Sequence, residues 1–395
     1  MMAKDPLRVL QVIDSLGMGG AETWLMEVLR FWSRTGAVRM DFLATSGNRG
    51  IFDDEAQSLG AHVHYVRYRR AHLWTFARHF REVLRSGRYH AIHDHQDYVS
   101  GWHFGMGGRA LPIVRVTHVH NPAYQIRNNY GVTRARRLAS RIGKALVARY
   151  ATHITGTSRQ VLTEYGFDAS PFRRIPKAAL HCGFEPMRFA GDVLALRTSV
   201  RKEFAWPEDT RIVLFAGRID QSAAVDDPQN HKNSSFAVSV GIECARQDPR
   251  ARLLLAGNPS AAVPALQQRV AAAGYGGRIH FAGIRTDIER LMLASDVLLF
   301  PSRGEGLGMV AVEAQAAALP VLASTNVPRE CVVVPELVRF RNVEDGAAVW
   351  AAELLDLAAQ PRNFMDSNRR VAASAFAIEH SARALLRLYS EGALV

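Results

Sequence analysis

Cysteine is scarce in this chain, and long apolar segments are missing. The 395 residues include only Cys182, Cys244 and Cys331, which lie far apart. Neither a disulfide framework nor a paired-cysteine metal site is therefore expected. There is no run of about 18 apolar residues, so no membrane-spanning helix is expected. The first residues lack the apolar core of a signal peptide, and a cytoplasmic protein is the simplest expectation.

Acidic residues are absent between Asp97 and Glu164, although ten basic residues lie there. Residues 1–185 carry 26 Lys and Arg against 14 Asp and Glu, a net charge of +12, whereas residues 186–395 carry 23 of each. This excess predicts an anionic partner, and the inner face of the cytoplasmic membrane fits better than nucleic acid because no nucleic-acid-binding motif accompanies the charge. The alternative is a solvated surface in an arginine-rich chain.

The apolar content of 48% excludes intrinsic disorder, and the length indicates two domains at about 150 residues each. Short apolar runs alternate with helical patterns along both halves. The expected strands are 7–13, 40–44, 63–66, 91–93, 113–117, 153–155, 211–217, 252–257, 279–282, 297–300 and 321–323. The expected helices are 21–32, 73–85, 134–149, 236–245, 265–273, 288–294, 309–318, 347–358 and 378–389.

This alternation predicts an α/β protein with two Rossmann-like, doubly wound domains that face each other across a cleft. We expect an N-terminal domain over residues 1–185 and a second domain over residues 186–375. The last segment, 376–395, is expected to form a helix that crosses back to the first domain. Ligands of such sheets bind beyond the carboxyl ends of the strands, so the loops that follow strands are the candidate sites.

The first of these loops is rich in glycine. Gly19 and Gly20 stand between a strand and a helix, where the backbone can approach a phosphate or sugar. The loop is not a dinucleotide fingerprint, because the third glycine of that motif would fall at Glu22. A plain tight turn is the alternative.

The strongest local pattern spans residues 301–314. Gly304, Gly306 and Gly308 allow backbone amides to turn toward a ligand at the start of a helix. Glu305 lies in the loop and Glu313 follows eight residues later, so two carboxylates could hold two parts of an elongated, polyhydroxylated ligand. A helix-terminal charge followed by a solvated glutamate is the alternative.

Cations and histidines end other strands. Arg218 follows one strand, and Lys232 precedes the next helix, an arrangement that can neutralise a diphosphate, although both could equally be exposed loop cations. His118, His120 and Asn121 follow the strand at 113–117. His93 and His95 end the preceding strand, where a structural role is the alternative. No Asp-x-Asp pair occurs, and no metal site is expected.

As an ordered set, these motifs resemble those of the bacterial family 4 retaining glycosyltransferases, which have the two-Rossmann GT-B fold. Transferases of capsule and exopolysaccharide synthesis are the most similar. The resemblance spans the whole chain and rests on the following motifs: Gly19-Gly20-Ala21-Glu22, Arg115-Val116-Thr117-His118-Val119-His120-Asn121, Ala216-Gly217-Arg218, Lys232-Asn233, and the pair Glu305 and Glu313. Three features depart from the family pattern, one of which is Ala318 in place of a glycine often found before Leu-Pro. His181-Cys182-Gly183-Phe184 replaces Asn-Gly-Ile-Asp, and the loop before Lys232 is longer than usual.

The resemblance implies a role for each candidate residue. Those assigned to the donor diphosphate are Gly19, Gly20, Arg218, Lys232, Gly306, Leu307 and Gly308. Glu305 would contact the donor sugar, Glu313 the ribose, and Ile284 and Arg285 the base. His118 and Glu305 are the implied catalytic residues, with Glu22, His120 and Asn121 on the acceptor side. Partners would be a nucleotide-sugar, a lipid-linked saccharide acceptor and an anionic membrane, with no nucleic acid.

The expected reaction is sugar transfer with retention of anomeric configuration in exopolysaccharide, capsule or lipopolysaccharide synthesis. It would need neither cofactor nor metal. No carboxylate is evidently placed as a nucleophile, so front-face attack is expected, with the leaving phosphate accepting the proton. Two alternatives stay open: a nucleotide-sugar epimerase of the same fold, and a non-catalytic sugar-nucleotide or polysaccharide-binding protein.

Overall fold

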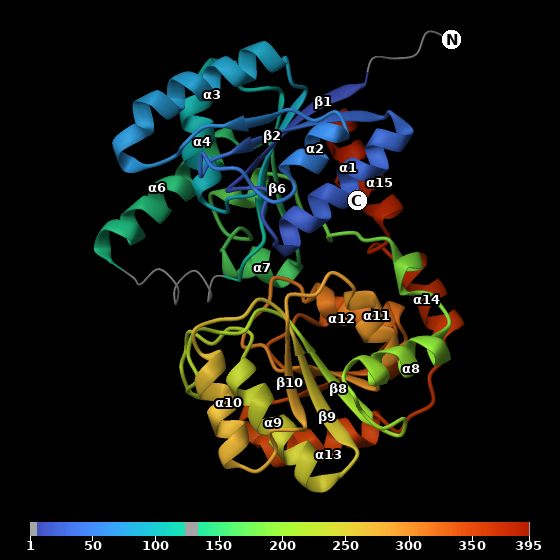
Figure 1. Ribbon diagram of the computed structural model, residues 1–395. Helices are drawn as coiled ribbons and strands as arrows, with labels where there is room; N and C mark the ends of the chain where they lie inside the picture. The colour runs from blue at the N-terminus through green and yellow to red at the C-terminus, as the bar shows by residue number, and fades with distance from the viewer. Residues whose placement is uncertain (1–5, 123–132, 395) are drawn as a thin grey trace. The chain divides into compact units, whose positions relative to one another are not determined.

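A computed structural model describes residues 6–122 and 133–394. The chain divides into two compact units, each with its own sheet (Figure 1). Unit 1 comprises Met1–Phe184 together with Ala375–Val395, and unit 2 comprises Glu185–Ser374.

Unit 1 contains a parallel sheet of seven strands in the order β3-β2-β1-β4-β5-β6-β7. Its strands are β1 (Leu7–Ile13), β2 (Val38–Ala44), β3 (Val63–Tyr65), β4 (Ala91–Asp94), β5 (Val114–Val119), β6 (His153–Gly156) and β7 (Lys177–Ala179). Its helices are α1 (Gly20–Thr35), α2 (Asp53–Ser58), α3 (Leu73–Gly87), α4 (Val99–Gly107), α6 (Arg134–Tyr150), α7 (Arg159–Glu164) and α15 (Ile378–Glu391). The first six strands were predicted to within two residues at each end, whereas β7 was not.

Apolar patterning accounts for these elements. In α3, Phe76, Phe80 and Leu84 recur at a spacing of four residues and are buried against the sheet, as an amphipathic helix requires. Helices α4 and α6 approach closely, because a Cβ at Gly101 would lie 2.1 Å from the carbonyl oxygen of Gly143. The C-terminal helix α15 packs against α1 and β1, so the end of the chain belongs to unit 1.

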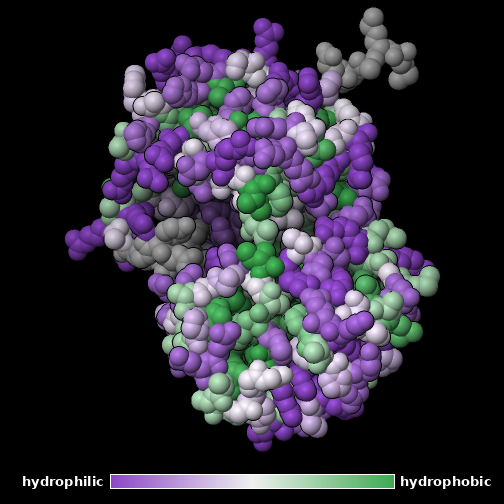
Figure 2. Space-filling view, viewed as in Figure 1, coloured by the Kyte–Doolittle hydropathy of each residue, from purple (hydrophilic) through white to green (hydrophobic). Residues whose placement is uncertain are grey.

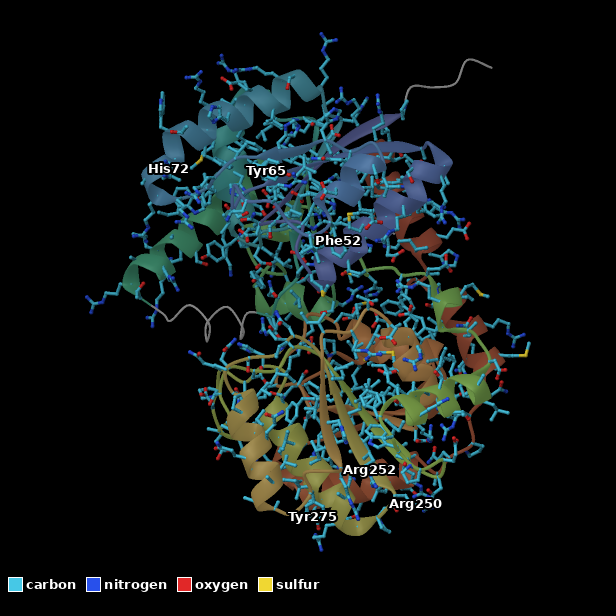
Figure 3. All side chains as sticks on the ribbon, viewed as in Figure 1. Phe52, Tyr65, His72, Arg250, Arg252 and Tyr275 are labelled. Carbon is cyan, nitrogen blue, oxygen red and sulfur yellow. The ribbon has the colours of Figure 1, made fainter. Side chains whose placement is uncertain are left out.

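Unit 2 contains a parallel sheet of six strands in the order β10-β9-β8-β11-β12-β13. Its strands are β8 (Arg211–Ala216), β9 (Ala251–Ala256), β10 (Ile279–Gly283), β11 (Val297–Phe300), β12 (Val321–Ser324) and β13 (Val338–Arg341). Its helices are α8 (Val193–Glu203), α9 (Ser234–Gln247), α10 (Val263–Ala272), α11 (Ile288–Ala294), α12 (Met309–Ala316), α13 (Ala347–Leu357) and α14 (Phe364–Ala372). Arg250, Arg252 and Tyr275 mark the amino-terminal edge of this sheet (Figure 3).

Both sheets reverse their strand order once, between β1 and β4 in unit 1 and between β8 and β11 in unit 2. At such a switch point the loops after the two strands diverge, leaving room for a ligand at the carboxyl edge. Two doubly wound, Rossmann-like domains are thus confirmed. The loops that carry most of the candidate residues follow these strands or their neighbours.

Candidate functional site

In unit 1, the loop after β1 brings Gly19 and Gly20 to the start of α1. The carboxylate of Glu22 folds back over this turn, because a Cβ at position 19 would lie 2.2 Å from its Oε2. Glycine at position 19 therefore makes room for this carboxylate. Burial raises the pKa of Glu22, and the nearby charge of Asp14 raises it further, against the opposing effect of a backbone hydrogen bond.

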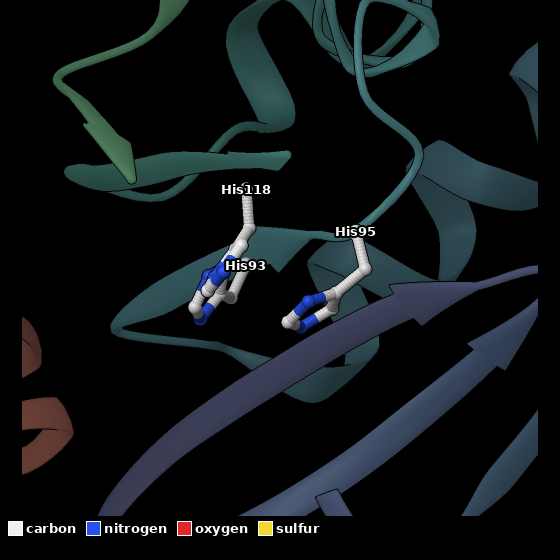
Figure 4. Close-up of side chains that lie close together, drawn as sticks. All are labelled: His93, His95 and His118. Atoms are coloured by element: carbon white, nitrogen blue, oxygen red, sulfur yellow. The ribbon is translucent and has the colours of Figure 1, made fainter. Parts of the chain in front are cut away.

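His93 in β4, His95 just after it and His118 in β5 lie close together (Figure 4). The Trp24 ring of α1 contacts His95 and His118. His118 is 0% exposed, and the Trp24 ring meets it edge-on at a centroid distance of 5.5 Å. Possible ligand atoms of His93, His95 and His118 lie within 4.8 Å of one another, a tighter grouping than the sequence predicted. These three could in principle hold a metal ion, but most of their ring nitrogens already contact other side chains.

A buried carboxylate that the sequence analysis missed anchors the next loop. Asp97 follows β4 with a left-handed φ of 51°, and its Oδ1 accepts a hydrogen bond from the backbone N–H of His120 at 3.1 Å. Burial raises its pKa to about 7, although hydrogen bonds from His120 and Asn121 act in the opposite direction. Asp97 thus fixes the two acceptor-side candidates, His120 and Asn121. Its place at a strand end next to the histidines was the available signal.

In unit 2, Lys232 and Glu305 meet directly. Lys232 Nζ lies 2.6 Å from Glu305 Oε1, and both residues are half-buried. Asp220, which the sequence analysis did not single out, accepts hydrogen bonds from the backbone N–H groups of Lys232 and Ser234 at 3.1 and 2.9 Å. The longer loop before Lys232 is tied down as well, since Arg303 donates to the carbonyl of Val225 at 2.7 Å. The insertion therefore leaves Lys232 beside Glu305.

Arg218 is exposed at the carboxyl end of β8, and no ion pair joins it to another described residue. The loop that carries Arg218 packs closely against the residue after β9, because a Cβ at Gly257 would lie 1.9 Å from the carbonyl oxygen of Gly217. A guanidinium that is exposed and unpaired in the described chain can bind an anion without first breaking an ion pair.

The loop after β11 leads into α12 through Gly308, whose φ of 92° lies in the left-handed region that favours glycine. Leu307 is buried, whereas Gly306 and the α12 residue Glu313 are half-buried. The α12 N-terminus and the Lys232–Glu305 pair therefore share one edge of the sheet.

The two base-binding candidates differ from each other. Ile284 is exposed, as a residue that stacks on a ligand would be. Arg285 instead contacts Asp287 at 2.8 Å and Glu203 at 2.6 Å, and these bonds raise its pKa. Arg285 would have to leave these carboxylates to bind a base.

The candidate residues thus form two groups, one at the carboxyl edge of each sheet. In unit 1 the group consists of Gly19, Gly20, Glu22, His118, His120 and Asn121. In unit 2 it consists of Arg218, Lys232, Ile284, Arg285, Glu305, Gly306, Leu307, Gly308 and Glu313. A pair of cationic side chains, a carboxylate and a helix N-terminus in unit 2 can hold a diphosphate and hydroxyl groups.

The basic helix α6 presents a mixed surface. Its N-terminal half carries exposed Arg134, Arg136 and Arg137, and Leu138 and Ile142 are 59% and 38% exposed. The opposite side of α6 packs on α4 through Gly143. The visible surface of unit 1 is mostly hydrophilic with isolated apolar side chains (Figure 2). Among the residues that the structure describes, no helix has the length and apolar character needed to cross a bilayer.

Two protein families match consecutive parts of the chain. Residues 18–178 match the family described as Glycosyltransferase Family 4, and residues 210–360 match the family described as Glycosyl transferases group 1. The matches correspond to unit 1 and unit 2 in turn.

Individual relatives agree with these families. EpsF of Bacillus subtilis (strain 168), assigned as a glycosyltransferase, is 26% identical over 358 residues, covering 90% of this chain and 88% of EpsF. The lipopolysaccharide core biosynthesis mannosyltransferase LpsB of Rhizobium meliloti (strain 1021) is 34% identical over 134 residues, 31% of this chain and 37% of LpsB.

Solved structures share the fold at low sequence identity. The crystal structure of HepE from Anabaena in complex with UDP and glucose has a TM-score of 0.72 at 16% identity, covering 98% of this chain and all of HepE. WaaG, a glycosyltransferase involved in lipopolysaccharide biosynthesis, has a TM-score of 0.69 at 15% identity, covering 97% of this chain and all of WaaG.

Proposed function

Because the chain belongs to the group 1, family 4 glycosyltransferases, we propose that it moves a sugar from a nucleotide-sugar to a hydroxyl of a lipid-linked saccharide acceptor. The reaction retains the anomeric configuration and serves exopolysaccharide, capsule or lipopolysaccharide synthesis. Two similar proteins support a role in lipopolysaccharide synthesis: LpsB is described as a lipopolysaccharide core biosynthesis mannosyltransferase, and WaaG as a glycosyltransferase involved in lipopolysaccharide biosynthesis. A UDP- or GDP-sugar is the proposed donor, and the UDP and UDP-glucose complexes of HepE favour UDP.

The contact between Lys232 and Glu305 carries the proposal. A diphosphate needs cations, a sugar needs hydrogen-bond acceptors, and this pair sets one beside the other at 2.6 Å. Lys232 and Arg218 bind the diphosphate together with the amides of Gly306, Leu307 and Gly308. Glu305 then accepts hydrogen bonds from donor-sugar hydroxyls. The two cations supply the charge that a metal would otherwise provide, so the reaction proceeds without one.

The chemical step needs no covalent intermediate. The acceptor oxygen forms a bond to the anomeric carbon on the face from which the diphosphate departs. The bond between that carbon and the diphosphate oxygen breaks, and the acceptor proton passes to the departing phosphate. Arg218 and Lys232 stabilise the negative charge that develops there. His118 in unit 1 is assigned to the reacting groups, Glu313 to the ribose, and Ile284 and Arg285 to the base.

The donor is tested by thermal unfolding with UDP-, GDP- and ADP-sugars. A donor at a hundredfold excess over its dissociation constant should add about 2.7 kcal/mol of stability. Glu305→Gln should lower kcat on the order of 100-fold, because a hydrogen-bond acceptor at the sugar is weakened. Glu336→Gln is the matched control, since it removes another Glu carboxylate of unit 2, one paired with Arg370. Equal rates in both variants would remove Glu305 from the site.

Two measurements on the product test the mechanism. NMR of the anomeric proton must show the configuration of the donor, and an inverted product would overturn front-face attack. Turnover must persist in EDTA, and rescue by a divalent ion after loss would overturn metal independence. Incubation with donor alone separates the alternatives, because an epimerase converts the sugar without an acceptor and a binding protein converts nothing.

We further propose that α6 rests on the inner face of the cytoplasmic membrane. Exposed Leu138 and Ile142 lie among cations, the composition of a surface-bound helix. The protein should sediment with anionic vesicles and not with neutral ones, and less so in high salt. Leu138→Ser should weaken this binding. Leu194→Ser on α8, which removes an equally apolar, exposed side chain from unit 2, should not. Equal sedimentation with both vesicle types would refute the proposal.

A further inference from the structure

Four histidines, one glutamine and one tyrosine in unit 1 form two hydrogen-bonded rows beneath Trp24. In the first row, His95 Nε2 contacts Gln11 Oε1 at 2.8 Å, and His95 Nδ1 contacts His120 Nε2 at 2.8 Å. In the second row, His93 Nδ1 contacts the Tyr389 hydroxyl at 2.6 Å, and His93 Nε2 contacts His118 Nδ1 at 3.1 Å. The rows stack on each other, with 4.2 Å between the ring centroids of His93 and His95 and also between those of His118 and His120.

The four rings are neutral at ordinary pH. Burial lowers the pKa of His93, His95 and His118 well below the usual 6.5, and lowers that of His120 to about 3. A neutral imidazole carries one N–H and one acceptor nitrogen. The N–H groups of each row must therefore all point the same way along the row, and the group at its end decides which way.

Gln11 sets the direction of the first row. Its amide Nε2 donates to the Tyr389 hydroxyl oxygen at 3.1 Å, so its Oε1 faces His95. A carbonyl oxygen can only accept, which places the proton of His95 on Nε2. His95 Nδ1 is then the acceptor, and His120 must donate from Nε2.

Gln11 also fixes the positions of the protons in the second row, through its hydrogen bond to Tyr389. The Tyr389 oxygen accepts from Gln11, and its own O–H is left to donate to His93 Nδ1. His93 then carries its proton on Nε2 and donates it to His118 Nδ1. His118 in turn carries its proton on Nε2. That atom is buried and has no hydrogen-bond partner among the described residues.

We propose that Gln11, Tyr389 and His93 are positioning residues that hold His118 as an Nε2–H donor aimed at a substrate oxygen. His118 thus acts as a hydrogen-bond donor to the sugar or the phosphate and does not act as a base. The catalytic part of this inference rests on the proposed function, whereas the tautomer itself does not. Helix α15 then has a chemical role besides packing, since Tyr389 comes from the far end of the chain.

Metal binding is the competing use of these rings. A metal between His93 and His118 would need both nitrogens of their hydrogen bond as acceptors, and their separation of 3.1 Å is that of a direct N–H···N bond. The geometry therefore favours the hydrogen-bonded rows. Addition of Zn²⁺ to the apo-protein tests this directly, because ligation would remove the N–H signal of His93.

Long-range ¹H–¹⁵N spectra of histidine-labelled protein distinguish protonated from unprotonated ring nitrogens. The expected result for the wild type is Nε2–H on His93, His95, His118 and His120, with no substrate present. A His118 protonated on Nδ1, or a charged one at neutral pH, would overturn the proposal. This readout is independent of turnover, so a chain that shows the expected tautomers and transfers no sugar would refute the proposed function alone.

Tyr389→Phe removes the donor to His93 and keeps the ring that packs against Trp32. This variant should let His93 and His118 exchange between tautomers and should lower kcat about tenfold. The thermal stabilisation of the protein by the nucleotide-sugar should not change. Tyr89→Phe is the matched control, because it removes another buried hydroxyl of unit 1, one that donates to Asp41 at 2.9 Å. Unaltered His118 signals in Tyr389→Phe would overturn the proposal.

Substitution of His93 provides a second test that does not depend on the folding of Tyr389→Phe. His93→Gln retains an N–H that can reach His118 Nδ1, whereas His93→Leu retains none. We expect His93→Gln to keep the Nε2–H tautomer of His118 and most of the activity that His93→Leu loses. Equal activity and equal His118 spectra in the two variants would contradict the inference.

Discussion

Asp97 makes the stability of this protein depend on pH in a direction that can be measured. Its carboxyl group is buried in the loop that follows β4, and burial raises its pKa from 3.8 to about 7, in spite of the hydrogen bonds it accepts. Between these two pH values the folded chain keeps the proton and the unfolded chain loses it. The folded state therefore binds more protons, and its stability must fall as the pH rises through this range.

The size of the effect follows from the two pKa values. A difference of about three units, at 1.36 kcal/mol per unit, corresponds to ~4 kcal/mol. The contribution of Asp97 is fully present below pH 4, declines toward pH 7 and is constant above it. Asp97→Asn cannot ionise, and its Oδ1 can still accept from the His120 N–H. The variant should equal the wild type near pH 4 and exceed its stability by ~4 kcal/mol at pH 8.

Urea unfolding of the whole chain at several pH values, compared between variant and wild type by tryptophan fluorescence, measures this difference. Groups other than Asp97 titrate in both proteins and cancel. A stability difference between variant and wild type that does not change from pH 4 to pH 8 would show that the folded state does not raise this pKa. A variant that is less stable at every pH would show that the carboxylate is needed for its charge.

Gly257→Ala should lower the free energy of unfolding by about 1–3 kcal/mol, because its Cβ would lie 1.9 Å from the carbonyl oxygen of Gly217. Since Gly217 precedes Arg218, the variant should also weaken the thermal stabilisation by the nucleotide-sugar. Gly276→Ala, whose Cβ meets nothing within 4 Å, is the control. Arg201→Met should cost about 1–3 kcal/mol of unfolding free energy, since it removes one hydrogen-bonded partner of the buried Asp296 and leaves the other, Arg197 at 2.7 Å, in place. The exposed Arg246→Met should cost less than about 1 kcal/mol. Lys232→Met should lower kcat/KM about 100-fold in a transfer assay, and an unchanged value would exclude it from diphosphate binding.

The predicted strands were most accurate where the sheet is deepest. β1 and β11 have the predicted bounds, since strands inside a parallel sheet are covered on both faces and are therefore mostly apolar. β7 and β13 were missed because each is a short, mostly half-buried edge strand that contains charged residues and forms no apolar run. Helix α4 was missed as well. It holds three glycines, and histidine and serine occupy buried positions, so its pattern does not stand out.

The residues of the candidate site likewise divide into those that the sequence revealed and those that it did not. Strand-end glycines, cations and glutamates were found because the chain itself places them after apolar runs. Gln11 was visible as a single polar residue inside an apolar strand, but its partner Tyr389 lies 378 residues away and could not be inferred. Asp220 and Asp97 escaped notice because their effect is to fix backbone N–H groups of other loops.

The order of apolar runs, helical patterns and strand-end motifs alone thus determined the fold class and the family, because both depend on local patterning along the chain. Only the tertiary structure decided which side chains are paired with each other. The contact of Lys232 with Glu305, the two histidine rows and the ion pairs of Arg285 depend on distances between segments that are remote in sequence. Such distances follow from how strands are ordered in a sheet, a property that no local pattern encodes.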